Sequence, residues 1–179
     1  NVTAALVKEL RDITGAGMMD CKKALVATDG NIEAAIEEMR KSGALKAAKK
    51  ATRTAAEGII VSAHEGNQVV LVEVNSETDF AAKNAEFVEF AEKVAQIALK
   101  TEGECVETLK AAKYDDKQTV GEALTALIAK IGENLGIRRI FRATGDVLGI
   151  YVHSNKRIGV VTVLEGGDAE LAKNVAMHV

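Results

Sequence analysis

Residues 69–87 read VVLVEVNSETDFAAKNAEF, and this stretch sets the architecture expected for the chain. It opens with an apolar, β-branched run, which is typical of a buried strand. A helical pattern begins at Asn84, a residue type that often caps helices. The connection between them carries an acid, Asp79, beside a large aromatic, Phe80, and connections are where binding residues tend to lie. The first candidate site residues are therefore Thr78, Asp79 and Phe80.

A β-hairpin is expected before this connection, and a long helix after it. Residues 59–63 alternate with period two, and Glu65–Asn67 is rich in turn-forming residues, so residues 59–75 predict an antiparallel strand pair. Beyond Asn84, apolar residues recur at helical spacing to about residue 100. Residues 119–131 show the same spacing and predict a further helix.

The two ends of the chain predict different structures. Three short helical patterns, separated by turn residues, lie before about residue 45. At the other end, three short β-rich runs predict a meander of strands at 137–143, 147–153 and 157–164, and a last helix begins at Asp168.

The whole pattern predicts an α+β fold in three parts. Residues 1–54 form a three-helix head with a basic linker, residues 55–136 form a first subdomain with a β-hairpin plus helices, and residues 137–179 form part of a second subdomain with the meander plus a helix.

Composition indicates a folded chain. Hydrophobic residues make up 47% of it, which is ordinary for a globular protein, while aromatics make up only 3%. Cys21 and Cys105 lie far apart without metal-ligand spacing, so we expect two reduced thiols. No apolar run reaches the roughly 18 residues that span a membrane, and the N-terminus lacks the apolar block of a signal peptide. We therefore expect a soluble, cytoplasmic protein.

Charge is distributed unevenly along the chain. Residues 1–54 carry ten Lys and Arg against seven Asp and Glu, whereas the remainder carries thirteen against nineteen. A nucleic-acid-binding protein would be basic along its binding groove. A small basic head on an acidic body therefore argues against a nucleic-acid partner.

No catalytic arrangement is found in the sequence. Nucleotide-binding glycine motifs are missing, and the three histidines lie on separate predicted elements. Side chains alternate between the two faces of a strand, which would put Glu73, Glu77 and Asp79 on the same face. Such a row of carboxylates is more often a solvated face than an acid–base pair. We expect no catalytic residues, no metal and no cofactor.

Five blocks together resemble bacterial elongation factor Ts, in order and over essentially the whole chain. They are LVKELRDITGAGMMDCKKAL (6–25), MRKSGALKAAKK (39–50), EVNSETDFAAKNAEF (73–87), AKIGENLGIRR (129–139) and RIGVVTVLEGG (157–167). The resemblance implies a head similar to a ubiquitin-associated domain, followed by an α+β core. Many members continue with a helical hairpin and a C-terminal helix, so we expect a chain truncated before both. Ala81 stands where the family usually has Val, which should trim the apolar surface beside Phe80.

The resemblance also implies a function in translation. The family binds elongation factor Tu in its GDP- and Mg²⁺-bound form and acts as its guanine nucleotide exchange factor. Phe80 would wedge between helices of the partner's GTP-binding domain, and Asp79 would disturb the groups that hold Mg²⁺. From the residues alone, Asp79 serves equally as a helix-entry cap and Phe80 as a hydrophobic staple onto the following helix.

The head carries a second group of residues that the resemblance assigns to partner contact. Met18 and Met19 follow a glycine turn as a pair, and one helical face cannot bury both well. The resemblance implies that they dock on the GTP-binding domain with Arg11 and Lys22. The alternative is that Met18 belongs to the core and the two basic residues are solvated.

Two further positions are associated with partner contact in the family. Ile131 is equally well explained as a core residue, whereas His153 at a strand end fits a surface contact better. The strands from Ile137 onward are expected to face a different domain of the partner from the one Phe80 contacts. Membrane contact is not expected, and homodimerisation of the full-length family stays open.

Two competing interpretations remain. In the first, the chain is an adaptor module that binds a partner through its head, and Phe80 is buried. In the second, it is a small enzyme with a ligand-sized pocket around Glu73, Glu77 and Asp79. The exposure of the Phe80 ring discriminates most simply between the adaptor and the exchange factor.

Overall fold

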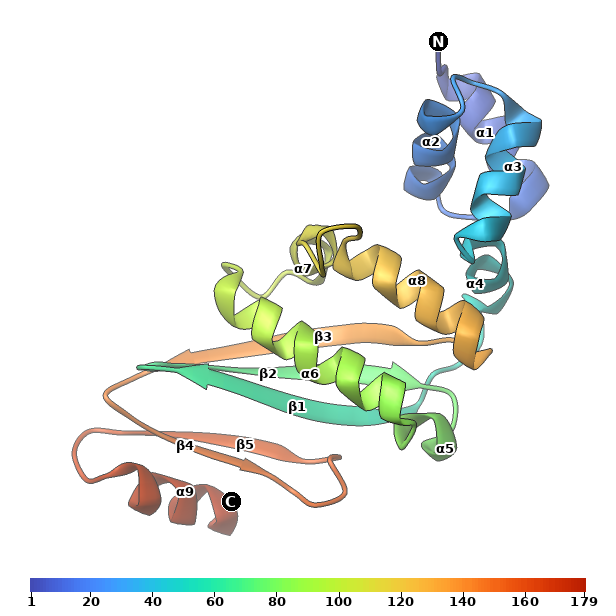
Figure 1. Cartoon of the computed structure of the whole chain (residues 1–179). Helices are drawn as coiled ribbons and strands as arrows, with labels where there is room; N and C mark the ends of the chain where they lie inside the picture. The colour runs from blue at the N-terminus through green and yellow to red at the C-terminus, as the bar shows by residue number, and fades with distance from the viewer. The chain divides into compact units, whose positions relative to one another are not determined.

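The computed structural model describes all 179 residues, which divide into two compact units (Figure 1). One unit comprises Asn1–Thr54 and Glu122–Asn134, and the other comprises Ala55–Gly121 and Leu135–Val179. The chain holds nine helices and five strands, and the strands form two small antiparallel sheets. The predicted α+β class is therefore confirmed, while the three predicted domains with boundaries after residues 54 and 136 stay a prediction.

The first unit is helical. Its elements are α1 (Ala4–Thr14), α2 (Met18–Ala27), α3 (Ile32–Lys41), α4 (Ala44–Lys50) and, from Glu122 onward, α8 (Val120–Ile131). The Thr3 hydroxyl accepts a hydrogen bond from the Leu6 N–H, and the Asn31 side chain accepts one from the Ala34 N–H. These caps satisfy backbone donors that the start of a helix leaves without an internal partner.

A small apolar core joins α1 to α4. Leu10, Cys21 and Leu25 are fully buried in it, together with Met39 of α3. Gly43, at the start of α4, has a φ of 81°, and a Cβ there would lie 2.7 Å from the Cβ of Ala129 on α8. The unit therefore packs a helix from much later in the chain against α4, at a contact with no space for a side chain.

The second unit is built on a three-stranded antiparallel sheet in the order β1-β2-β3. Its strands are β1 (Glu57–Glu65), β2 (Gln68–Ser76) and β3 (Gly136–Thr144). Helix α6 (Ala85–Lys100) lies across one face of this sheet (Figure 1). Val61 and Val72 pair across β1 and β2 and are buried, as are Phe87 and Val94 of α6. Each such side chain contributes roughly 1.5–3 kcal/mol through burial.

The meander predicted for the three C-terminal strands is wrong, because they divide between two sheets. β3 pairs with β2, whereas β4 (Val147–Val152) and β5 (Gly159–Leu164) pair with each other. β3 matches β2 over nearly its whole length and adds the buried Ile137 and Ile140 to the sheet. That burial outweighs the usual preference of a strand for its neighbour in sequence.

The β4–β5 hairpin lies against β1 and carries the last helix on its other side (Figure 1). The Ile60 N–H donates to the Lys156 carbonyl at 2.6 Å, which ties the hairpin turn to β1. α9 (Ala169–His178) packs on β4, and the Thr162 hydroxyl donates to the Ala172 carbonyl at 2.6 Å. Two short helices, α5 (Asp79–Ala82) and α7 (Val106–Ala111), complete the unit.

Arg142 of β3 anchors the C-terminal end of α6. Its guanidinium donates to the carbonyls of Ala98 and Thr101, each at 2.5 Å, and to that of Gly103 at 3.3 Å. A cation is favoured at this end of a helix, where the last carbonyls lack internal partners. These bonds hold α6 to the sheet. The segment that precedes α6, residues 79–82, is therefore attached to a helix that is fixed in position.

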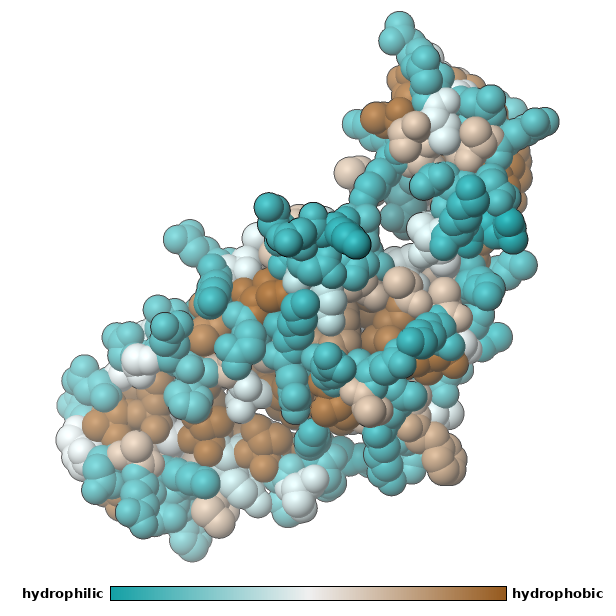
Figure 2. Space-filling model, viewed as in Figure 1, coloured by the Kyte–Doolittle hydropathy of each residue, from teal (hydrophilic) through white to brown (hydrophobic).

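Three features considered in the sequence can be compared with the fold. Both cysteines carry free thiols, with Cys21 buried and Cys105 exposed. No group of three or more His, Cys, Asp or Glu side chains gathers in a way that could hold a metal ion. None of the helices has the length and apolar character that crossing a membrane would require. Hydrophilic residues predominate on the face shown in Figure 2, and hydrophobic residues appear between them in separate patches.

Candidate functional site

Phe80 lies on α5, the single helical turn between β2 and α6, and its side chain is 82% exposed. The next two residues, Ala81 and Ala82, are buried. The turn is therefore packed onto the protein by its small residues while its one large apolar side chain points away. A staple onto the following helix would bury the ring against that helix, so the exposure argues against that interpretation.

Hydrogen bonds fix the start of this turn. The Thr78 hydroxyl accepts from the Ala81 N–H at 3.2 Å and caps α5. Ser76, at the end of β2, is fully buried, and its hydroxyl donates to the Thr78 carbonyl at 2.9 Å. The Asn84 side chain then caps α6 by accepting from the Glu86 N–H at 2.9 Å. Each junction from strand to turn to helix is thus held by a polar side chain.

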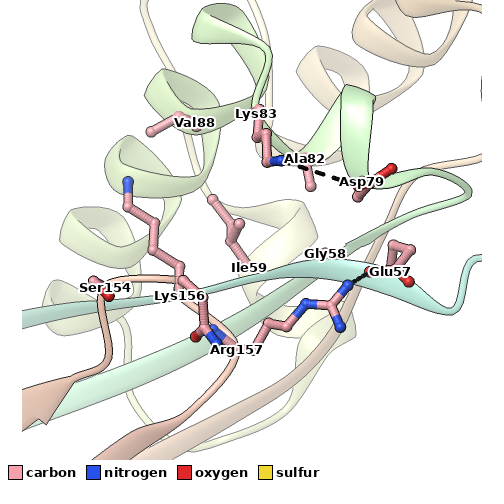
Figure 3. A pocket seen from close by; sticks show the side chains of 11 residues that line it. Glu57, Gly58, Ile59, Asp79, Ala82, Lys83, Val88, Ser154, Lys156 and Arg157 are labelled. Carbon is pink, nitrogen blue, oxygen red and sulfur yellow. Dashed lines mark hydrogen bonds and ion pairs between the residues drawn. The ribbon is translucent and has the colours of Figure 1, made fainter.

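Asp79 sits beside Phe80 in the first turn of α5, with its carboxylate exposed. Its Oδ2 lies 4.0 Å from Nζ of Lys83, one helical turn later. It lines a hollow of about 290 Å³ together with Ile59 and Val88, and the 154–157 turn lies across the hollow from it (Figure 3). Exposed pairs of this kind contribute little to stability, typically below about 1 kcal/mol, so the Asp79 carboxylate is available to a partner.

Glu73, by contrast, forms ion pairs within the protein. Its carboxylate accepts from Nε of Arg139 at 2.8 Å and from the Asn75 amide at 3.0 Å, and Arg138 lies 3.6 Å away. Burial disfavours the charged form of Glu73, but the hydrogen bonds from Asn75 and Arg139 and the arginine charges outweigh it and lower the pKa. Glu73 lines a second hollow, of about 230 Å³, which Asp79 does not line. The single pocket around the row of carboxylates that the enzyme interpretation expects is not formed by these two residues.

The lowered pKa makes a prediction for stability. A carboxyl group whose pKa is lower in the folded state stabilises the fold above its unfolded pKa, and this contribution is lost as the pH falls through the folded pKa. We expect Glu73→Gln to reduce the free energy of unfolding by about 1 kcal/mol near neutral pH. The difference from the native sequence should shrink as the pH falls below about 4.3. Urea unfolding at several pH values measures both quantities.

Glu107→Gln is a matched control for that experiment, because Glu107 forms a 3.5 Å ion pair with Lys110 on the surface. Surface pairs contribute little, so this change is expected to shift the unfolding free energy by less than about 0.5 kcal/mol. A Glu73→Gln effect that is the same at low and neutral pH would contradict the ion-pair account.

His153 follows β4 and is exposed at the start of the turn to β5. Its Nδ1 lies 2.9 Å from the Tyr151 hydroxyl. It belongs to the same unit as Phe80, and the 154–157 turn that follows it lines the hollow with Asp79. Of the predicted residues in this unit, only Asp79 lines the 290 Å³ hollow. Thr78 and Phe80 are its neighbours in sequence, and His153 directly precedes the 154–157 turn.

The predicted head residues lie in the other unit, at the start of α2. Met18 is 56% exposed and Met19 75% exposed, so the interpretation of Met18 as a core residue is wrong. The first residue of α2 that is buried in the core is Cys21, which is fully buried. Arg11 and Lys22 are exposed on α1 and α2. A pair of exposed, adaptable methionines flanked by basic residues is suited to protein contact.

Ile131 is the last residue of α8 and is half-buried. Gly132 follows with a φ of 84°, and its N–H donates to the Ile128 carbonyl at 2.8 Å. The helix therefore ends at a left-handed glycine, which leaves the half-buried Ile131 at the tip of the helix. Its location is compatible with both the core and the contact interpretation.

Sequence reasoning missed several residues around the hollow. Glu57 pairs with Arg157 across 100 positions of the chain, and Lys156 lies 4.0 Å from Glu92. A local sequence pattern cannot predict pairs between residues so far apart in the chain. Tyr151 did carry a usable signal, because residues two apart on a strand share a face, which places it beside His153.

Comparison with known proteins agrees with the resemblance. The sequence profile of the family described as Elongation factor TS matches residues 77–179. Over the whole chain, the sequence is 59% identical to Elongation factor Ts of Aeromonas salmonicida and 57% identical to that of Tolumonas auensis. Over 99% of the chain, it is 56% identical to Elongation factor Ts of Xylella fastidiosa. The chain spans 61% of the length of each of these relatives. The profile covers more than half of the sequence, and the chain belongs to the elongation factor TS family.

Proposed function

We propose that this chain is a guanine nucleotide exchange factor that binds elongation factor Tu carrying GDP and Mg²⁺ and promotes the release of GDP. The observation that carries the proposal is the Phe80 ring, 82% exposed on a turn that is capped and anchored on both sides. Rigidly presented aromatics are typical anchors of protein interfaces. Membership of the elongation factor TS family supports the same activity.

Exchange makes and breaks no covalent bond, so the factor acts only through differential binding. It must bind its partner more tightly in a form that holds nucleotide poorly. By linkage, the factor then weakens nucleotide binding as much as nucleotide weakens binding of the factor. A 10⁴-fold effect corresponds to about 5.5 kcal/mol of differential contact. One buried aromatic anchor with rearranged polar groups can supply that amount.

The two side chains of the turn have separate roles in this proposal. Phe80 wedges between helices of the GTP-binding domain and stabilises their displaced arrangement. Asp79, on the same turn and held at its start by the Thr78 cap, brings a negative charge to the groups that retain Mg²⁺. The charge of that ion is a large part of what holds the diphosphate, so disturbing its ligands releases GDP.

The remaining predicted residues contribute to docking. Met18, Met19, Arg11 and Lys22 form an exposed apolar and basic surface that contacts the GTP-binding domain. Ile131 and His153 add contacts at the tip of α8 and at the start of the β4–β5 turn. The adaptor interpretation required a buried Phe80, and its exposure favours exchange. We place this activity in the cytoplasm, without a membrane or nucleic-acid partner.

The proposal is tested with purified elongation factor Tu loaded with a fluorescent GDP analogue. Stopped-flow mixing with this chain and excess unlabelled GDP should accelerate loss of fluorescence. Amounts of the chain well below those of the partner should suffice, because an exchange factor is not consumed. Binding of the chain without any acceleration would overturn the proposal.

A further inference from the structure

The imidazole of His153 contacts the side chain of Tyr151, which lies two residues earlier in β4. The Tyr151 hydroxyl lies 2.9 Å from Nδ1 of His153, and the two ring centroids are 6.1 Å apart with the ring planes inclined by 71°. Tyr151 is half-buried at the end of β4, whereas His153 is exposed. The hydrogen bond therefore fastens an exposed ring to a partly buried one.

The backbone under His153 is fixed as well. Its N–H donates to the Ile158 carbonyl at 2.8 Å, and its carbonyl accepts from the Lys156 N–H at 2.7 Å. The carbonyl of Lys156 in turn accepts from the Ile60 N–H of β1 at 2.6 Å. With the turn tied to the sheet, rotation of the His153 side chain is the main freedom left, and the bond to Tyr151 restricts it.

The chemistry of the two groups favours one of the two possible arrangements of the proton. A phenol hydroxyl donates readily, and the unprotonated nitrogen of a neutral imidazole is a good acceptor. In the arrangement in which the Tyr151 O–H donates to Nδ1, the proton of the neutral ring resides on Nε2. Nε2 is the nitrogen on the opposite side of the ring from the bonded Nδ1.

We propose that Tyr151 is a positioning residue that holds His153 in the Nε2–H form, with that N–H directed as a donor toward an oxygen acceptor on the GTP-binding partner. This rests on the proposed function, in which His153 contacts the partner. The acceptor is a backbone carbonyl or a carboxylate, because Nε2–H can only donate. Tyr151 itself acts through His153.

The first experiment reads the tautomer in the free chain, without any partner. Nitrogen-15 spectra of the side chains distinguish the protonated from the unprotonated ring nitrogen, and comparison with His153→Gln identifies the His153 signals. At a pH where the ring is neutral, we expect the Nε2–H form to predominate. In Tyr151→Phe, which removes one oxygen atom, we expect a mixture of both tautomers.

The matched control is Tyr114→Phe, since the chain has only two tyrosines. Tyr114 stacks near Phe90, with ring centroids 5.7 Å apart, and makes its contacts away from the β4–β5 hairpin. Its substitution should leave the His153 signals unchanged.

The second experiment measures affinity for nucleotide-free elongation factor Tu. We expect Tyr151→Phe to weaken binding about three- to tenfold, and to have no further effect once His153→Ala is present. His153→Gln keeps an N–H donor near the place of Nε2, so it should bind better than His153→Ala and be insensitive to Tyr151→Phe. A residue with a merely structural role would weaken binding equally in all backgrounds.

The outcomes separate this inference from the proposed function. If Tyr151→Phe leaves the tautomer of His153 unchanged, the positioning role is wrong whatever the affinities are. If the tautomer changes but His153→Ala binds like the native sequence, the donor role is wrong. In either case, acceleration of GDP release that depends on Phe80 would leave the exchange activity standing.

Discussion

Replacing Phe80 with alanine is expected to slow factor-stimulated GDP release about 10- to 100-fold at saturating factor. Burying a phenylalanine side chain contributes roughly 1.5–3 kcal/mol, and each 1.4 kcal/mol corresponds to a factor of ten. The ring is proposed to be buried only in the complex that holds nucleotide poorly, so its loss reduces the differential contact that drives release. Phe80→Leu, which keeps an apolar side chain, should retain part of the acceleration.

The folded chain itself should tolerate Phe80→Ala. Since the ring is 82% exposed, its loss removes little packing, and the free energy of unfolding should change by less than about 0.5 kcal/mol. Phe141→Ala is the matched control, because this ring is 50% exposed on β3, a strand expected to face a different domain of the partner from the one Phe80 contacts. It should leave the saturating release rate unchanged. An unaltered release rate in Phe80→Ala with intact binding would show that the ring is not a wedge.

Gly149→Ala is expected to destabilise the second unit strongly. A Cβ at position 149 of β4 would lie 2.0 Å from the carbonyl oxygen of Ala172 and 2.4 Å from the Thr162 hydroxyl. Ala172 and Ala176 are the buried residues of α9, and the helix packs against β4. The added methyl must push backbone away, which costs about 3 kcal/mol and breaks the bond from Thr162 to Ala172.

Hydrogen exchange locates this effect. A loss of about 3 kcal/mol corresponds to roughly 100-fold faster exchange of the amides that open with α9 and the β4–β5 hairpin. Amides of α6 and β2 should exchange as slowly as in the native sequence, because their burial does not involve Gly149. Gly136→Ala is the control, since a Cβ there meets nothing within 4 Å and the φ is not positive. Unchanged exchange of α9 in Gly149→Ala would contradict the close approach of the two backbones.

Much of the fold follows from local patterns. The hairpin at Glu65–Asn67 and the start of α6 at Asn84 were predictable, because turn and cap residues act through hydrogen bonds within a few positions. The stripe of α6 was predictable from its period alone. The partner of β3 was not, since Ile140 meets Val72 across 68 residues and only the assembled sheet decides that pairing.

The candidate site, too, was predictable from the sequence only in part. The sequence predicts that Asp79 and Phe80 lie on a connection, but it does not give the direction of the ring. An aromatic side chain at the start of a helix can either pack on that helix or point into solvent. Burial of Ala81 and Ala82 decides that direction, and this depends on packing in three dimensions. The hollow beside Asp79 could not be predicted at all, since Glu57 and Arg157 reach it from distant segments.

The central claim is that this chain and GDP oppose each other's binding to elongation factor Tu, and equilibrium affinities test it most directly. The dissociation constant of the chain should be measured for the nucleotide-free partner and for the partner saturated with GDP and Mg²⁺. We predict an affinity at least about 100-fold weaker in the second case, with the affinity for GDP lowered by the same factor when the chain is bound. Equal affinity of the chain for the two forms would contradict the account.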